Sequence, residues 1–172
     1  VSTMVKALAQ YYRICLSSGQ DIIPLRRELE HIENYIIIQN MRYDDIIEME
    51  IAVDEKYMDV RIPKLTLQPL IENSIEHGMK RVEEKRGSIK IYVKEKPTYL
   101  QLFVEDNGSG MEEQKLAYIN QNIGEFSTEI GYGINNVNKR IELLYGENYG
   151  LCFYNKETGG TVVEIKLPLP KQ

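Results

Sequence analysis

Residues 67–78 read LQPLIENSIEHG, and this stretch decides the fold of the chain. At helical spacing one side of it is apolar and should pack on a sheet: Leu67, Leu70, Ile71 and Ile75. The other side carries polar side chains: Asn73, Glu76, His77 and Lys80. Asparagine is a poor helix former, so Asn73 is better explained if its amide oxygen meets a cation. Mg²⁺ prefers oxygen ligands and usually accepts only one or two from protein.

A second motif, DNGSGM at residues 106–111, follows the alternating stretch 100–104, which reads as a strand. A carboxylate such as Asp106 at a strand end can accept a hydrogen bond from the amino group of adenine. Gly108 and Gly110 permit backbone conformations that let a flat base approach closely. An Asp-Asn-Gly sequence also forms plain hairpin turns, but here the following residues have a helical pattern.

The third motif is GYGINNV at residues 131–137, at the start of another predicted helix. Free N–H groups at that helix start can meet phosphate oxygens. The motif is neither a P-loop nor a dinucleotide-binding fingerprint, because it lacks the P-loop lysine and no strand leads directly into it. Residues 121–132 are polar without an apolar period, and we expect a mobile loop that closes over phosphates. Lys139 and Arg140 either reach phosphate or are surface charges.

Together the three motifs supply an amide for a metal ion, a carboxylate that reads a base and a glycine-rich phosphate loop. The combination predicts a site for ATP and Mg²⁺, in which Asn73 is the metal ligand.

The remaining elements place these motifs in an α+β fold. Strands are expected near residues 47–53, 89–93, 100–104, 150–154 and 161–167, and helices near 64–81, 112–120 and 133–145. The second and third strands flank a polar turn and should form a hairpin. We expect a two-layer α/β sandwich, with a mixed or antiparallel sheet covered on one face by helices. This catalytic domain should span residues 44–172 and follow a helical segment at 1–43.

The N-terminal segment carries two amphipathic stripes. The first stripe is Val1, Val5, Leu8, Tyr12 and Cys15, in a helix that Gly19 should end with a left-handed cap. Pro24 can open a second helix, with the stripe Leu25, Leu29, Ile32 and Ile36. The two helices are either ordinary core helices or part of a dimer seam.

Composition excludes several classes of protein. The 172 residues, 42% of them hydrophobic, suffice for one domain with a small appendage. A net charge of -5 argues against a general nucleic-acid-binding protein. The longest aliphatic run, residues 36–38, is far shorter than the roughly 20 apolar residues of a membrane span, so no direct membrane contact is expected. Cys15 and Cys152 match no metal or redox spacing and are predicted to be buried, reduced thiols.

The motifs resemble those of sensor histidine kinases of the LytS/YesM type. LQPLIENSIEHG resembles the N box of that family, DNGSGM its G1 box, GYGINNVNKRIELLYG its G2 region and GGTVVEIKLP its closing strand. LRRELEHIENYIIIQNMRY resembles the segment just after the phosphoacceptor helix. The resemblance covers nearly the whole chain and implies a Bergerat-type ATP site, of the kind shared with gyrase, Hsp90 and MutL.

The resemblance also implies roles for individual residues. Asn73 is similar to the family's Mg²⁺ ligand and Asp106 to its adenine reader. The matched motifs place these further residues at the nucleotide: His77, Gly108, Gly110, Gly131, Gly133, Ile134 and Thr161. By resemblance His77 lies near the ribose or the phosphates; otherwise it is a solvated histidine. The implied partners are ATP, a response regulator and, through upstream helices, a second copy of a membrane-anchored parent whose cytoplasmic portion contains this chain.

Departures from the family pattern refine the expected activity. Pro69 stands where ATPase relatives carry a water-activating glutamate four residues before the asparagine, which disfavours hydrolysis. Glu72 is the carboxylate nearest to Asn73 and the second candidate catalytic residue, although it points toward the side of the helix. His31 does not stand in the family's phosphoacceptor motif. We therefore expect a fragment, beginning at Val1, that binds ATP but does not phosphorylate itself.

The leading hypothesis is the catalytic domain of an ATP-dependent protein-histidine kinase. It would transfer the γ-phosphoryl group to a histidine outside this sequence and thence to an aspartate of a response regulator. One alternative is a non-kinase member of the same fold group, such as an ATP-driven clamp, or a serine kinase of the anti-sigma type. Another is a nucleotide-sensing or dimerisation module without phosphotransfer.

Overall fold

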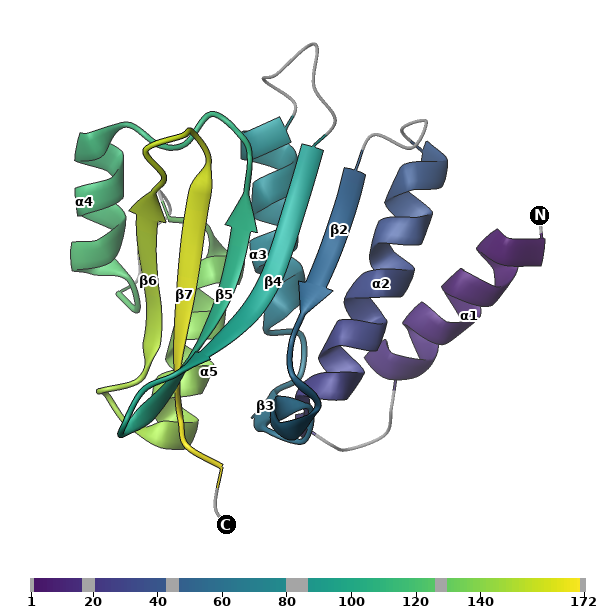
Figure 1. Cartoon of the computed structure of the whole chain (residues 1–172), viewed down its shortest axis with the longest axis horizontal. Helices are drawn as coiled ribbons and strands as arrows, with labels where there is room; N and C mark the ends of the chain where they lie inside the picture. Colours follow the sequence, from purple (N-terminus) through teal and green to yellow (C-terminus); the bar gives the residue numbers. More distant parts are fainter. Residues whose placement is uncertain (1, 17–20, 43–46, 80–86, 126–129, 171–172) are drawn as a thin grey trace.

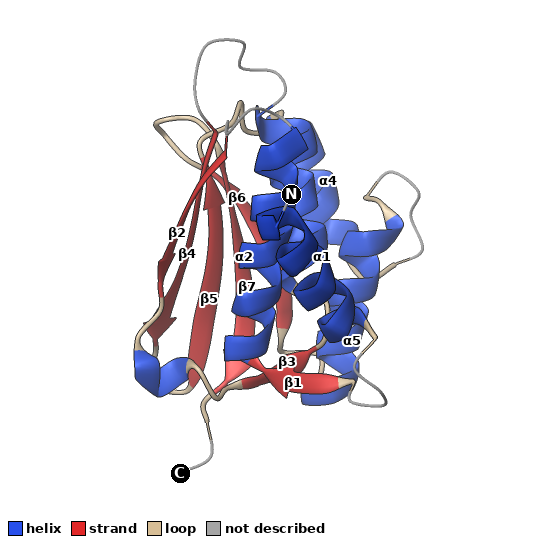
Figure 2. Cartoon of the chain, turned by 90° about the vertical axis from the view of Figure 1, so that its right-hand side faces the viewer, coloured by secondary structure: helices blue, strands red, loops and turns tan. Residues whose placement is uncertain are grey.

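The computed structural model describes residues 2–16, 21–42, 47–79, 87–125 and 130–170. One layer is a five-stranded sheet in the order β2-β4-β5-β7-β6, and the other layer consists of helices (Figure 1, Figure 2). The strands are β2 (Ile47–Ala52), β4 (Gly87–Glu95), β5 (Tyr99–Asp106), β6 (Gly150–Asn155) and β7 (Thr161–Pro168). β2 and β4 are parallel and the other three pairs are antiparallel. The predicted α+β two-layer sandwich with a mixed sheet is confirmed.

The order of the strands determines the position of the second motif, residues 106–111. β4 and β5 form the predicted hairpin, and the last strand, β7, lies between β5 and β6. The register pairs Glu105 of β5 with Val162 of β7. Asp106, at the end of β5, therefore lies beside Thr161, at the start of β7, although 55 residues separate them in sequence.

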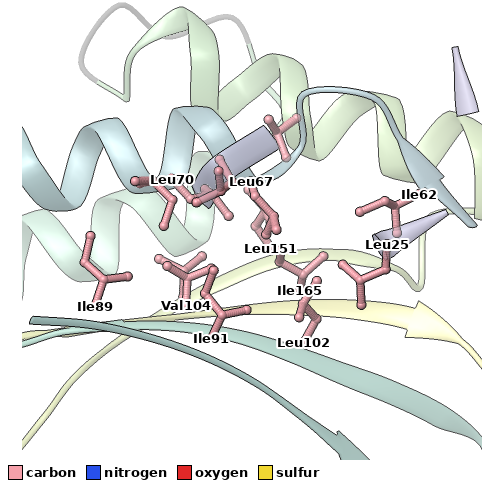
Figure 3. Packing of buried hydrophobic residues seen from close by; sticks show 14 of the residues in the cluster. Leu25, Ile62, Leu67, Leu70, Ile89, Ile91, Leu102, Val104, Leu151 and Ile165 are labelled. Carbon is pink, nitrogen blue, oxygen red and sulfur yellow. The ribbon is translucent and has the colours of Figure 1, made fainter. Parts of the chain in front are cut away.

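The core lies between the sheet and four helices, which are α2 (Leu25–Arg42), α3 (Leu67–Asn73), α4 (Glu113–Asn122) and α5 (Tyr132–Tyr145). Leu67 and Leu70 of α3 face Ile89 and Val104 of the sheet (Figure 3). These side chains are almost completely buried, which confirms the predicted apolar side of the third helix. Burying them is the main favourable contribution to folding, about 1.5–3 kcal/mol for each large aliphatic side chain.

The helix of the first motif differs in detail from its prediction. It begins at Leu67 instead of residue 64 and continues after Asn73 as a π-helix, η2 (Ser74–Met79). Its predicted end at Arg81 lies outside the described residues. π-Helical turns inside helices are rare and often occur at functional sites.

The two N-terminal helices are α1 (Ser2–Cys15) and α2 (Leu25–Arg42), and α1 packs on α2 at the edge of the molecule (Figure 1). The stripe predicted for α2 is buried in the core. In the stripe predicted for α1, Val5 and Tyr12 are 58% and 56% exposed, so it is not part of the core of this chain, and the dimer seam stays a prediction. Ala7 is the buried position among the α1 side chains that the structure describes. Gly19 lies outside the described residues.

Two short strands were not predicted. β1 (Ile22–Pro24) pairs with β3 (Arg61–Pro63), and a 3₁₀ turn, η1 (Glu55–Tyr57), precedes β3. Three residues are too few to show a period, so only the tertiary structure reveals this pair. Cys152 is a free thiol but is only half-buried, contrary to prediction, because residue 152 alternates away from the core-facing Leu151 and Phe153.

Candidate nucleotide site

A cleft of about 540 Å³ is lined by residues of the first two motifs and by the residue directly before the third motif. Its lining residues are Asn73, Ser109, Gly110, Met111, Glu112, Lys115, Ile119 and Ile130. Asn73 comes from the first motif, residues 109–111 from the second, and Ile130 directly precedes the third. α4 supplies Lys115 and Ile119, which had not been identified from the sequence.

Asp106, at the end of β5, is not among the residues that line this cleft; it lines a separate hollow of about 280 Å³, together with residues of β2 and β4, Glu105 and Lys156. Its side chain is nearly buried, and its Oδ1 accepts hydrogen bonds from the backbone N–H groups of Gly108 (2.8 Å) and Thr161 (3.1 Å). The other oxygen, Oδ2, forms no hydrogen bond with any residue that the structure describes. A fixed carboxylate with one free acceptor oxygen is suited to binding an amino group.

Asn155 and Gly160 shape the segment after Asp106, and sequence reasoning missed both. The Asn155 side chain accepts a hydrogen bond from Met111 N–H (2.9 Å) and donates one to the Met111 carbonyl (2.6 Å). Gly110 lies close to both Asn155 and Gly160 and has a φ of +73°, a backbone conformation that favours glycine. The only sequence signal for Gly160 was the Gly-Gly pair in the turn before β7.

Asn73 lies half-buried at the cleft, and its side chain forms no hydrogen bond with another described residue. Among the described residues no group of three or more histidines, cysteines or carboxylates could hold a metal ion. A cation here would therefore take most of its ligands from phosphate and water. That donor set suits Mg²⁺, which keeps several waters and binds few protein oxygens.

The predicted phosphate residues have different surroundings. Gly131 has a φ of +86°, and a Cβ there would meet no atom of the described residues within 4 Å. Gly133 packs on α3, where its Cβ would lie 3.2 Å from the Cβ of Pro69. Ile134 has its side chain in the core, which leaves only its backbone to face a ligand. His77 belongs to η2, but its side chain lies outside the described residues.

Neither basic residue of α5 lines the cleft. Lys139 pairs with Glu142 at 3.4 Å, and Arg140 donates a hydrogen bond to the Lys64 carbonyl at 2.7 Å. Of the two alternatives, Lys139 therefore fits a surface charge, while Arg140 connects α5 to the segment between β3 and α3. Of the predicted loop 121–132, residues 121 and 122 belong to α4, Tyr132 begins α5, and residues 126–129 lie outside the described chain.

The helix that carries Asn73 is capped by a residue of α2. The Glu28 carboxylate accepts hydrogen bonds from the N–H groups of Leu65 (2.5 Å), Thr66 (3.0 Å) and Leu67 (3.1 Å). Burial raises the pKa of Glu28, and the three backbone donors and His31 act against that rise. A carboxylate at a helix N-terminus satisfies otherwise unpaired N–H groups and interacts favourably with the helix dipole.

Glu72, the second candidate catalytic residue, is exposed on α3. Its Oε1 accepts a hydrogen bond from Gln68 Nε2 at 2.8 Å, on the side of α3 that faces α1 and α2. It is therefore adjacent to Asn73 in sequence but held on a different side of the helix.

Comparisons with known proteins agree with this geometry. Residues 58–171 match the family described as histidine kinase-, DNA gyrase B- and HSP90-like ATPase, and residues 1–47 match a histidine kinase family. The sensor protein kinase HptS of Staphylococcus aureus is 34% identical over 171 residues. The match covers 98% of this chain but 32% of HptS, so the chain spans about a third of that relative.

Solved structures show the same fold. The catalytic domain of the histidine kinase ThkA superposes with a TM-score of 0.61 at 21% identity, covering 86% of this chain and 94% of that domain. ThkA in complex with the response regulator TrrA gives a TM-score of 0.61 at 19% identity, over 96% of this chain and 48% of that one. The Erythrobacter litoralis blue-light activated histidine kinase EL346 gives 0.57 at 20% identity, over 98% and 48%.

No helix within the described parts of the chain is long and apolar enough to cross a membrane. The family match extends over more than half of the sequence and includes the whole of the cleft described above. The chain belongs to the family of histidine kinase-, DNA gyrase B- and HSP90-like ATPases, as an ATP-binding catalytic domain of the histidine kinase type.

Proposed function

We propose that this chain is the catalytic part of a sensor histidine kinase of the LytS/YesM type, and that it transfers the γ-phosphoryl group of ATP to a histidine. The observation that carries this proposal is the cleft in which Asn73, residues 109–111 and Ile130, directly before the third motif, meet. The order of the boxes along the chain, including the segment before the ATP-binding domain, supports the LytS/YesM subtype.

Asp106 binds the adenine amino group through its free Oδ2, and the N–H groups of Gly108 and Thr161 keep the carboxylate oriented. The N–H groups at the start of α5, after Gly131, bind phosphate oxygens. Asn73 gives its amide oxygen to Mg²⁺, which neutralises charge on the triphosphate when bound. Gly110 leaves space for the base.

Transfer then needs mainly positioning and electrostatics. One imidazole nitrogen of the acceptor forms the new N–P bond, while the bond from the γ-phosphorus to the bridging oxygen breaks and ADP leaves with that electron pair. The Glu72 carboxylate accepts the proton of the other imidazole nitrogen. Pro69 offers no carboxylate to activate water, which favours transfer over hydrolysis.

The rest of the protein is part of the same proposal. Residues 1–43 form the end of a dimerisation and phosphoacceptor region, and residues 44–172 form the catalytic domain. α1 presents an exposed apolar face that fits a second copy of the protein: Met4, Val5, Tyr12 and Leu16. A response regulator receives the phosphoryl group, and the parent is anchored in the membrane with this part in the cytoplasm.

Incubation of the full-length protein with γ-labelled ATP and Mg²⁺ tests this function. The expected label on protein is labile in acid and stable in base, while the chain by itself binds ATP but takes up no label. Release of inorganic phosphate without labelled protein would support an ATP-driven clamp instead. An acid-stable label would indicate a serine kinase, and bound nucleotide without any reaction would indicate a sensing module.

A further inference from the structure

The side chain of Gln68 in α3 forms hydrogen bonds with one residue of α1, one of α2 and one of α3 itself. Its Oε1 lies 2.6 Å from His31 Nε2 in α2, and its Nε2 lies 2.9 Å from the Tyr11 hydroxyl in α1. The same Nε2 donates to Glu72 Oε1 at 2.8 Å, one turn further along α3. The Tyr11 ring also stacks on the His31 ring, with centroids 4.6 Å apart.

The chemistry of Glu72 determines the orientation of this group. An ionised carboxylate only accepts hydrogen bonds, so the NH₂ group of Gln68 must face Glu72. The amide oxygen must then face His31, whose Nε2 must carry a hydrogen. His31 is completely buried, and its Nδ1 has no hydrogen-bond partner in the described structure. The short contact with the Gln68 amide oxygen therefore places a hydrogen on His31 Nε2.

The group connects the N-terminal helices to Glu72, the residue directly before Asn73, which lines the cleft. The second oxygen of Glu72, Oε2, forms no hydrogen bond with a described residue. Both hydrogens of the Gln68 amide are used, and its oxygen is used by His31. Such saturation fixes the Gln68 rotamer and, through it, the Glu72 carboxylate, because each alternative orientation leaves a polar group unpaired.

We propose that Gln68 is a positioning residue for phosphoryl transfer, which holds the Glu72 carboxylate in place and is itself oriented by His31 and Tyr11. This proposal rests on the function proposed above, and in particular on the role of Glu72. It gives the buried His31 a purpose other than accepting phosphate. It also makes the position of α1 relevant to the reaction, since Tyr11 is one of the three partners of Gln68.

The first test needs no catalysis and uses the chain as it stands. The protein has two histidines, His31 and His77, so their ¹⁵N imidazole signals are readily assigned. The His31 signals should show a hydrogen on Nε2, and Gln68→Met should change them while leaving His77 unaffected. A His31 Nε2 without a hydrogen, or signals unchanged in Gln68→Met, would overturn the assignment.

The second test measures autophosphorylation of the full-length protein. Gln68→Met should lower kcat roughly tenfold to a hundredfold, as expected for a misplaced catalytic group, with little change in the KM for ATP. The double variant Gln68→Met, Glu72→Gln should be no slower than the slower single variant, because both changes remove the same oriented carboxylate. Independent, multiplying effects would contradict the proposal.

Variants of the two supporting residues complete the test. His31→Gln keeps an N–H donor toward Gln68 and should retain more activity than His31→Leu. Tyr11→Phe keeps the ring stack and removes one acceptor, so it should lower kcat, whereas Tyr154→Phe, which removes an exposed hydrogen bond to Glu164, should not. If the unchanged protein phosphorylates itself and both Tyr11→Phe and Gln68→Met keep full activity, only the positioning role is refuted. Absence of labelling in the unchanged protein would instead refute the proposed function.

Discussion

Gly160 lies so close to Asp106 that a Cβ on residue 160 would stand 2.1 Å from the Asp106 carbonyl oxygen. The turn before β7 is thus packed directly on the backbone of the residue that we assign to adenine binding. A side chain at position 160 would force these two backbone segments apart.

Gly160→Ala should therefore lower the free energy of unfolding by about 2–4 kcal/mol, from the clash and from a φ of +99°. Gly159→Ala is the matched control, since φ there is +89° but its Cβ would have ordinary contacts. Backbone strain alone should cost about 1–2 kcal/mol at that position. Equal losses in urea unfolding of the two variants would show that the close approach to Asp106 has no energetic consequence.

Glu28→Ala should destabilise the protein by about 3 kcal/mol, because three N–H groups at the start of α3 lose their acceptor. Glu30→Ala, in the same helix, removes only an exposed ion pair with Arg27 and should cost about 0–1 kcal/mol. Chemical denaturation of both variants measures the difference. A loss at Glu28 no larger than that at Glu30 would mean that the cap is not needed.

Asn120 of α4 pairs with the backbone of the edge strand β6. Its side chain accepts a hydrogen bond from the Phe153 N–H and donates one to the Phe153 carbonyl, both at 2.8 Å. Asn120→Ala should cost about 1–3 kcal/mol and accelerate hydrogen exchange at Phe153, because both backbone groups lose their partner. Asn122→Ala in the same helix removes only an exposed local bond to the Tyr118 carbonyl. Unchanged exchange at Phe153 would contradict this role of Asn120.

The hydrogen bond from Tyr57 to Glu95 should stabilise the folded protein to a degree that depends on pH. Its hydroxyl donates to Glu95 Oε2 at 2.7 Å, and this bond, together with Lys56, lowers the pKa of Glu95. A lowered folded-state pKa contributes stability above the unfolded-state pKa that is lost as the pH falls through the folded value. The unfolding free energy of Tyr57→Phe should therefore depend less on pH below about 4.3, the ordinary glutamate value. An identical slope in both proteins would exclude the coupling.

The sequence predicted the elements correctly where the apolar residues repeat over a long stretch and one face of the element is buried. The stripe of α2 and the apolar side of α3 both lie in the core as predicted, because their spacing leaves no other arrangement that buries them. The strand pattern likewise predicted every strand of the main sheet, since alternation places one face on the helices.

Sequence reasoning failed where contacts link distant residues. Nothing local distinguishes Ala7 from Val5 as the buried position of α1, since the choice depends on the surface of α2. The insertion of β7 beside β5, and with it the bond from Thr161 to Asp106, follows from pairing across 55 residues. Glu28 and Asn155 carry no motif, because their partners are backbone groups whose positions only the fold determines.

Nucleotide affinity of the chain, measured by titration calorimetry with and without Mg²⁺, tests the central claim most directly. Asp106→Asn should abolish measurable ATP binding, because the amide presents an N–H group where an acceptor oxygen is required, while the exposed Asp21→Asn should bind as the unchanged chain does. Asn73→Ala should still bind nucleotide but lose the enhancement by Mg²⁺. Unchanged affinity in Asp106→Asn, together with an unchanged effect of Mg²⁺ in Asn73→Ala, would contradict the assignment of this cleft as the ATP site.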